Sequence, residues 1–186
     1  NLFSDNLVAN NTNNVRDQAN GTNFWNTTLQ PGPNIIGGPL IGGNFWGNYN
    51  GTDTDGDGIG DTDLPYTNYG QIGMGGDFAP LVPPVPVACG QVRTQNGTLS
   101  IDLTCAGDGV ILARSGIALD CAGHLLLGNS TGFGVLIENS SNASVTNCAI
   151  KNFSYGIRVE NANLSVLANN NLSNSAFSGI TIELTS

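Results

Sequence analysis

The chain has 186 residues, a formal net charge of −9 and only five Lys or Arg, and its length suits one domain with a sizeable core. Without a basic patch it could not release the counterions of a nucleic acid, which argues against nucleic-acid binding. No run of about 18 apolar residues occurs, so we expect no membrane span. Strong helix formers are scarce beside Asn, Gly, Ser and Thr, which favours short strands and tight turns. The chain begins at Asn1 without a signal peptide, so we expect that processing or selection of a segment set this end.

Residues 1–48 contain the sequence Asn-Phe-Trp twice, at 23–25 and at 44–46. Two tryptophans at this spacing could stack on a ligand. The apolar end of a stack of strands must also be covered, because an open end invites pairing with another chain. We therefore expect Trp25 and Trp46 to cap such an end.

Residues 49–79 contain the acidic stretch DTDGDGIGDTD, which starts at Asp53. In calcium loops, oxygens come from side chains at positions 1, 3 and 5, a carbonyl at 7 and a group at 9, and glycine at 6 permits the turn. These roles fall to Asp53, Asp55, Asp57, Ile59 and Asp61, with Asp63 as a substitute for the missing Glu of position 12. A solvated acidic turn is the alternative, but so many close carboxylates repel one another without a cation. We expect Ca²⁺, bound with a dissociation constant on the order of 10⁻⁴ M, as a rigidifying ion and not a reactant.

Residues 80–88 hold four of the eight prolines and are expected to form an extended linker. Residues 89–186 follow with four cysteines and no Cys-x-x-Cys pair, which favours two disulfides over a zinc site. The spacing favours Cys89–Cys105 and Cys121–Cys148, although the sequence leaves all three connectivities open. His124 is interpreted as a turn residue, because a catalytic dyad would need a second acid or base within reach.

A sequence repeat begins at Gly134, Gly156 and Gly179, and each copy opens with the pattern Gly-apolar-x-apolar-Glu. A period near 22 with short alternating strands is typical of a parallel β-solenoid, in which stacked coils bury one another's apolar face. The predicted stacks are Val135/Ile157/Ile180, Ile137/Val159/Ile182, Ile150/Leu172, Asn152/Asn174, Cys148/Asn170 and Glu138/Glu160/Glu183. Asparagines are expected at turns, with amides bonded along the stack. The stacked glutamates are expected at a solvated corner, because like charges repel.

The last coil breaks off at Ser186, and a further shift by one period continues the pattern at residues 1–11 of a second copy. The continued stacks are Asn170/Asn6, Leu172/Val8 and Asn174/Asn10. The module therefore runs from Cys89 through Ser186 and on through residues 1–79. Two arrangements fit: one long polypeptide repeats the unit, or separate chains meet head to tail. A truncated fragment is a third option.

The sequence holds eleven N-glycosylation acceptor sites of the type Asn-x-Ser/Thr, several times the number that chance gives. They are Asn10, Asn20, Asn26, Asn50, Asn96, Asn129, Asn139, Asn142, Asn152, Asn163 and Asn171. Asn, Ser and Thr also gather in turns, which would create such sites incidentally. Together with the predicted disulfides, the excess favours an extracellular or cell-surface glycoprotein.

The stretch ARSGIALDCAGHLLLG (113–128), followed by the Gly-apolar-x-apolar coils, resembles NosD-like or pectate-lyase-like parallel β-helix repeats of archaeal and bacterial surface proteins. Residues 34–66 resemble the segment that closes those β-helices. The resemblance implies an all-β, right-handed parallel β-helix. In the family the first stretch precedes the second, whereas here the order is reversed. Copper delivery, which the family name suggests, would need more His, Met or free Cys than one His and one Met provide.

We expect a structural role: a repeat unit of an extracellular filament or surface layer whose partner is another copy of itself. A carbohydrate-binding or adhesive module is the alternative. A polysaccharide lyase is less favoured, because only Arg158 among the basic residues lies in a clear coil, and no acidic constellation accompanies it. We therefore predict that the chain is not an enzyme.

Overall fold

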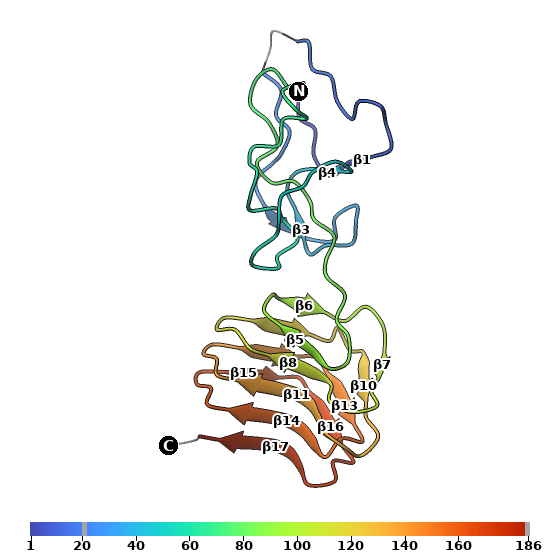
Figure 1. Cartoon of the computed structure of the whole chain (residues 1–186), viewed down its shortest axis with the longest axis vertical. Coiled ribbons are helices and arrows are strands. Elements are labelled where there is room, and N and C mark those ends of the chain that lie inside the picture. The colour runs from blue at the N-terminus through green and yellow to red at the C-terminus, as the bar shows by residue number, and fades with distance from the viewer. Residues whose placement is uncertain (20–21, 185–186) are drawn as a thin grey trace. The chain divides into compact units, whose positions relative to one another are not determined.

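The computed structural model describes residues 1–19 and 22–184, all of whose regular elements are β-strands (Figure 1). The chain divides into an N-terminal unit, Asn1–Pro84, and a C-terminal unit, Val85–Ser186. The division falls inside the proline-rich stretch 80–88, of which Leu81 is buried in the N-terminal unit and Val87 in the core of the C-terminal unit.

The C-terminal unit is a solenoid of four coils and the first strand of a fifth. Each coil contributes one strand to each of three sheets. The first coil has β5 (Gln91–Arg93), β6 (Gly97–Thr98) and β7 (Leu103–Thr104), and the second has β8 (Val110–Leu112), β9 (Ala118–Asp120) and β10 (Leu125–Leu127). The third has β11 (Phe133–Glu138), β12 (Ser144–Thr146) and β13 (Ala149–Lys151), the fourth has β14 (Tyr155–Glu160), β15 (Val166–Ala168) and β16 (Asn171–Ser173), and β17 (Ser178–Glu183) follows.

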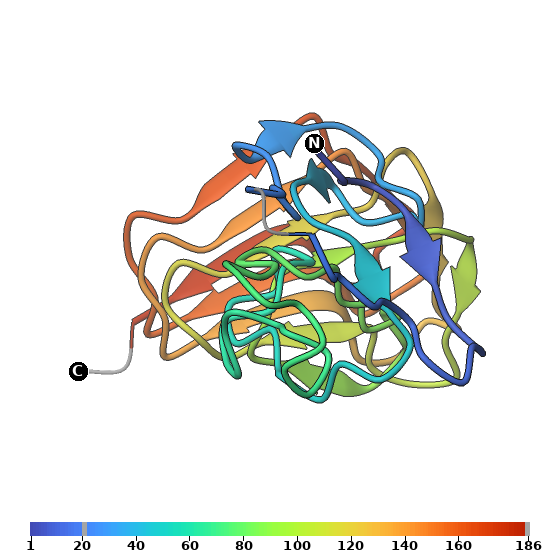
Figure 2. The ribbon, with the colours of Figure 1, turned by 90° about the horizontal axis from the view of Figure 1, so that it is seen from above.

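All pairings in these three sheets are parallel, in the orders β5-β8-β11-β14-β17, β6-β9-β12-β15 and β7-β10-β13-β16. Seen from above, strands of successive coils overlie one another (Figure 2). The predicted register is confirmed: Val135 pairs with Ile157 and Ile157 with Ile180, and Ile150 pairs with Leu172. The all-β solenoid predicted from the period is therefore confirmed.

The core of the solenoid consists of the inward-facing residue of each strand. Leu119, Val145, Ile137 and Ile150 are fully buried in one cluster, while their sequence neighbours face outward. A single coil has no second layer against which to pack, so the burial depends on the coils above and below.

The close approach of the coils requires the glycines that open the first two repeats, Gly134 and Gly156. A Cβ atom on Gly134 would lie 2.7 Å from the carbonyl oxygen of Gly156 and 2.3 Å from a methyl group of Ile150. A Cβ atom on Gly156 would lie 2.5 Å from the carbonyl oxygen of Gly179. Any larger residue would push adjacent coils apart, which explains the repeated Gly before the apolar pair.

Asparagine holds the corners of the coils, but for a reason other than the predicted amide ladder. Asn147, Asn152, Asn169 and Asn174 all have φ between 56° and 58°. Asn adopts this left-handed region more readily than other residues with a side chain. The amide of Asn170 binds the backbone of the coil beneath it and not another amide. The asparagine content thus follows largely from backbone geometry.

The stacked glutamates are confirmed in register, with Glu138 beside Glu160 and Glu160 beside Glu183. Solvation alone does not relieve their repulsion. The guanidinium of Arg158 lies 2.5 Å from a carboxylate oxygen of Glu160 and 2.9 Å from one of Glu183. One outward-facing arginine therefore bridges two coils, and it also lies over the Tyr155 ring at 5.3 Å.

The N-terminal unit is a shorter parallel stack with two excursions. β1 (Leu7–Val8) pairs in parallel with β4 (Phe45–Trp46), and parallel bridges join Leu2 to Phe24 and Asp17 to Ile72. Between Phe24 and β4 the chain forms the antiparallel pair β2 (Gln30–Pro31) and β3 (Leu40–Ile41). Between β4 and Ile72 it forms the acidic loop. The second layer thus extends to Ile72, beyond the boundary at residue 48 expected from the sequence.

Trp25 and Trp46 are buried in the core of this unit, with 7% and 2% of their surface exposed. Trp46 stacks on Tyr66 with ring centroids 4.7 Å apart, and Phe3 stacks on Trp25 at 4.6 Å. The alternative of a ligand-stacking pair is wrong, because the rings are covered. They form an interior row and not the expected end cap.

Asp77 is a fully buried carboxylate that joins separate segments of the N-terminal unit. It accepts hydrogen bonds from the backbone N–H of Asn44 at 2.7 Å, the indole N–H of Trp46 at 2.8 Å and the backbone N–H of Ala79 at 2.9 Å. Burial raises the pKa of this carboxyl, against the effect of these hydrogen bonds.

Candidate functional site

The first candidate site is the open end of the coil that residues 1–19 form. Asp5 and Asn10 have φ of 56° and 60°, and β1 lies between them. In the fourth coil, β16 lies between Asn169 and Asn174, which have φ of 57° and 56°. Two left-handed corners at the same separation, with a short strand between them, therefore occur in both units.

A second relationship links the same corners. The side chain of Asn170 accepts a hydrogen bond from the N–H of Cys148 at 3.0 Å and donates one to the carbonyl of Val145 at 2.8 Å. In the N-terminal unit, Asn44 accepts from the N–H of Asn6 at 3.2 Å and donates to the carbonyl of Phe3 at 3.0 Å. In each case one amide binds residue i and residue i−3 of the layer beneath it.

Both edges expose apolar side chains. Ile180, Ile182 and Leu184 are exposed on and beyond β17, the last strand of its sheet. Leu2 and Leu7 are 58% and 57% exposed in the first layer of the N-terminal unit. Such rows of exposed strand residues mark interaction surfaces or aggregation hazards.

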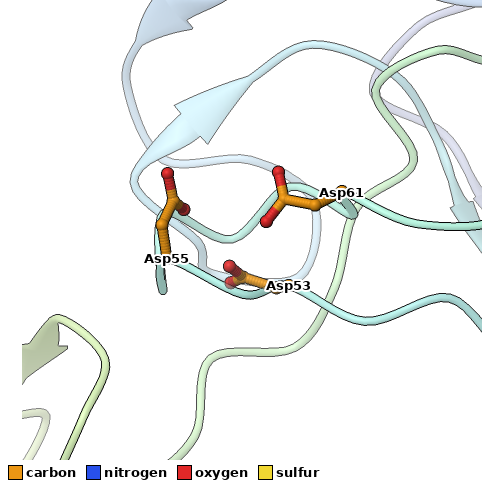
Figure 3. Close-up of side chains that lie close together, drawn as sticks. All are labelled: Asp53, Asp55 and Asp61. Atoms are coloured by element: carbon orange, nitrogen blue, oxygen red, sulfur yellow. The ribbon is translucent and has the colours of Figure 1, made fainter.

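The second candidate site is the acidic loop, where three of the predicted ligands come together. Oxygens of Asp53, Asp55 and Asp61 lie within 4.8 Å of one another (Figure 3). The loop is closed by its own backbone, because Asp53 accepts from the N–H groups of Gly56 at 2.6 Å and Gly58 at 2.9 Å. Asp61 accepts from the N–H of Thr54 at 2.7 Å and from its hydroxyl at 2.5 Å.

Two other predicted carboxylate ligands lie outside this group, and the role of the Ile59 carbonyl stays a prediction. The carboxylates of Asp57 and Asp63 are not part of the group of three. Asp57 instead accepts from the N–H of Ile59 at 2.8 Å, and Ile59 is buried against Leu81 and Ala79. Burial is the main cause that raises the pKa of Asp57, whereas hydrogen bonds from Thr54 lower the pKa of Asp61.

The cysteines form the two disulfides that the spacing favoured, Cys89–Cys105 and Cys121–Cys148. The second bond joins the corners of adjacent coils, with Cα atoms 4.7 Å apart. His124 has a partner that the sequence did not reveal: its Nδ1 lies 3.0 Å from Asp102. Asp102 also accepts from the N–H of Leu125, and this hydrogen bond lowers its pKa. Both side chains are partly exposed, and the pair ties adjacent coils together.

None of the predicted glycosylation sites among the described residues is buried. Asn20 lies outside the described residues. Asn10, Asn139, Asn142 and Asn152 have positive φ, so the fold itself accounts for asparagine at these positions. Whether they carry glycans stays a prediction.

The coils and their register define a right-handed parallel β-helix protein. Residues 1–51 match the family described as periplasmic copper-binding protein (NosD), and residues 101–186 match the family described as right handed beta helix region. Together with the stacked coils, these matches support a NosD-like parallel β-helix protein, as the motifs suggested. No curated protein and no solved structure matches the chain.

The side chains of this chain do not provide a suitable set of ligands for the copper that the NosD description names. All four cysteines are in disulfides, His124 lies in the C-terminal unit, and Met74 lies in the N-terminal unit. Cu binding favours imidazole, thiolate or thioether ligands, whereas the group of three carboxylates offers only hard oxygen. Among the described residues, no helix is long and apolar enough to cross a membrane. That the chain is not an enzyme stays a prediction. Arg158, the basic residue considered for a lyase, forms ion pairs with Glu160 and Glu183.

Proposed function

We propose that this protein is a structural repeat unit of an extracellular, glycosylated filament or surface layer. Copies join head to tail, so that residues 1–19 of one copy continue the coil that β17 of another copy begins. The observation that carries this proposal is the shared corner geometry. The segment from Asp5 to Asn10 shares two left-handed corners and a short strand between them with the segment from Asn169 to Asn174, and in the predicted register it lies one period further on.

The junction has a defined hydrogen-bond pattern. In the junction, Asn6 of the incoming copy lies above Asn170. Within one copy, Asn44 lies above Asn6 in the same way. The side-chain oxygen of the incoming Asn6 then accepts from the N–H of Asn170, while its amide N–H groups keep their hydrogen bonds to Ser4 and Asn44. In the same register Ser4 lies above Ala168, as Ala168 lies above Thr146.

Apolar burial supplies the free energy of the junction. Residues 14–19 of the incoming copy lie along β17 and cover Ile180 and Ile182. Each fully buried aliphatic side chain contributes about 1.5–3 kcal/mol relative to an exposed one. A head-to-tail contact joins two different surfaces, and where the rotation between successive copies does not close a ring it produces an open filament.

Ca²⁺ and glycans complete the proposal. Asp53, Asp55 and Asp61 supply the carboxylate oxygens that Ca²⁺ prefers, and the ion would fix the loop between β4 and Ile72. N-glycans on the exposed acceptor sites would cover a surface of low charge. Both features agree with a place outside the cytoplasm, as does the periplasmic description of the NosD family.

Cysteine cross-linking tests the junction. Two single variants, Ala168→Cys and Ser4→Cys, are prepared separately, mixed at micromolar concentration and oxidised gently. The proposal predicts a 1:1 cross-linked dimer that joins residue 168 of one copy to residue 4 of the other. A Lys151→Cys variant is the matched control, because Lys151 also faces outward but lies one coil further from the edge.

The proposal fails if the mixture gives only symmetric dimers of each variant, or if Lys151→Cys cross-links to Ser4→Cys equally well. The mass of the natural chain after reduction, deglycosylation and denaturation then separates the two arrangements. A mass near 19.2 kDa indicates separate subunits, and a multiple of it indicates tandem units in one polypeptide.

A further inference from the structure

The N-terminal unit contains an open cavity of about 540 Å³. Ten residues line it, and none of them is charged, although the chain has a net charge of −9. Six of them are Asn10, Asn11, Asn13, Asn14, Asn48 and Asn68. Gln71 adds a seventh amide.

The amides at the back of this cavity are held in place. Asn68 is buried and donates to the carbonyl of Val15 at 2.8 Å, while it accepts from Asn48 at 2.9 Å and from the hydroxyl of Tyr66 at 3.0 Å. The side chain of Asn14 donates to Asn48. The amides of Asn14, Asn48 and Asn68 are fixed by hydrogen bonds, whereas Asn10, Asn11 and Asn13 are exposed to solvent. The cavity therefore offers a polar surface that is partly preorganised for a ligand.

Tyr69 stands at the rim of the cavity in a strained conformation. It is 81% exposed and has φ of 56°, next to Asn68 with φ of 47°. The N–H of Gly70 bonds the carbonyl of Thr67 at 3.1 Å, so the two residues are the centre of a tight turn. Glycine would adopt this conformation without strain, whereas an exposed aromatic residue gains nothing from it in the free protein. Backbone strain of this kind is concentrated at ligand-binding and catalytic sites.

We propose that this cavity binds a neutral saccharide, with Tyr69 stacking on a sugar ring and the amides bonding its hydroxyl groups. Each amide offers a donor and an acceptor side by side, as vicinal hydroxyl groups require. The aromatic face of Tyr69 supplies the apolar contact. The absence of charge in the lining disfavours uronates, phosphates and charged peptides. The inference does not depend on head-to-tail assembly.

The test uses the full chain produced without N-glycosylation. Saturation-transfer NMR with neutral gluco-, galacto- and manno-oligosaccharides should show transfer to sugar protons, and oligogalacturonates should show none. Tyr69→Gly should weaken binding at least tenfold, while its thermal midpoint rises because the strain is removed. Phe78→Ala is the matched control: Phe78 is an exposed aromatic residue of the same unit outside the cavity, and its removal should leave binding unchanged.

No transfer to any neutral oligosaccharide would overturn the proposal, as would unchanged binding by Tyr69→Gly or equal binding of oligogalacturonates. Asn10 lies in the lining and in an acceptor site, so the sugar can be free or attached to the chain itself. Binding measured with the N-glycosylated protein distinguishes a free saccharide from a glycan attached to the chain. If the glycosylated protein no longer binds free sugar and enzymatic deglycosylation restores binding, a glycan of the chain itself occupies the cavity. If glycosylated protein still binds, the ligand is an external saccharide.

Discussion

Asn152 and Asn174 occupy the same corner of successive coils, with φ of 58° and 56°. A residue other than Asn, Asp or Gly pays about 1–2 kcal/mol in this region. We predict that Asn152→Ala lowers the free energy of unfolding by about 1 kcal/mol, whereas Asn152→Gly stays within a few tenths of the wild type. Urea unfolding measures both. The two variants remove the same glycosylation site, so glycan loss cancels, and equal stabilities would contradict the prediction.

Gly134 has no space for a side chain between its coil and the next. Gly134→Ala should destabilise the C-terminal unit by roughly 1–3 kcal/mol, since a Cβ there would meet the Gly156 carbonyl and Ile150. Gly107→Ala is the control, because nothing lies within 4 Å of a Cβ at that position. Thermal unfolding of both variants checks the difference. Similar losses in both would show that the coils can separate at little cost.

The disulfide Cys121–Cys148 closes a sequence separation of 27 residues in a fully buried position. Loop-closure entropy assigns such a bond about 3–4 kcal/mol. The double variant Cys121→Ala/Cys148→Ala should lose that amount in urea unfolding. The same replacement at Cys89 and Cys105, whose separation is 16, should lose slightly less. A larger loss at Cys89 and Cys105 would contradict the prediction, because loop length and burial both favour the Cys121–Cys148 bond.

Removal of Ca²⁺ should destabilise the N-terminal unit. With a dissociation constant on the order of 10⁻⁴ M, 10 mM Ca²⁺ adds about 2.7 kcal/mol to the free energy of unfolding. Asp55→Asn should abolish this gain, because Asp55 belongs to the group of three carboxylates. Asp63→Asn serves as the control outside the group. A Ca²⁺ effect equal in both variants, or none in the wild type, would exclude the site.

Tyr49 reports on the charge of the acidic loop. Burial, followed by the charges of Asp63, Asp61 and Asp77, raises the pKa of Tyr49 from 10.0 to about 12. Because the folded pKa lies above the unfolded one, this contribution to stability is complete below about pH 10 and is lost as the pH rises through about 12. Tyr49→Phe should remove that alkaline dependence, measured by unfolding in carbonate-free buffer.

Ca²⁺ should also shift this titration. A bound cation offsets the charge of Asp61, so the pKa of Tyr49 should fall in the presence of Ca²⁺. The difference in phenolate absorbance between wild type and Tyr49→Phe isolates this residue from Tyr66. An unchanged titration would place the ion away from Asp61.

Much of the C-terminal unit could be predicted from the period of the repeat. The pairs Val135/Ile157 and Ile150/Leu172 follow from it, because in-register parallel coils place residues one period apart side by side. The acidic loop was also visible as a pattern of alternating aspartates. The geometry of the loop was not visible. Asp57 accepts a hydrogen bond from the N–H of Ile59, and the carboxylates that come together are those of Asp53, Asp55 and Asp61.

The sequence by itself determined the class of fold and the strand register of the repeats from Gly134 onward, because these depend on local spacing repeated from coil to coil. It favoured the disulfide partners, and the structure decided them. Only the tertiary structure revealed Asp77 beneath Asn44 and Trp46, and Asp102 beside His124. It also showed that Asn44 binds Asn6 as Asn170 binds Cys148. The contacts of Asp77, and that of Asn44 with Asn6, join residues 31 to 38 positions apart, which is not the interval of the repeat. Asp102 and His124, like Cys148 and Asn170, lie 22 positions apart and therefore follow it. The partners of Asp77 and Asn44 are set by how the excursions and corners pack, which no local pattern records.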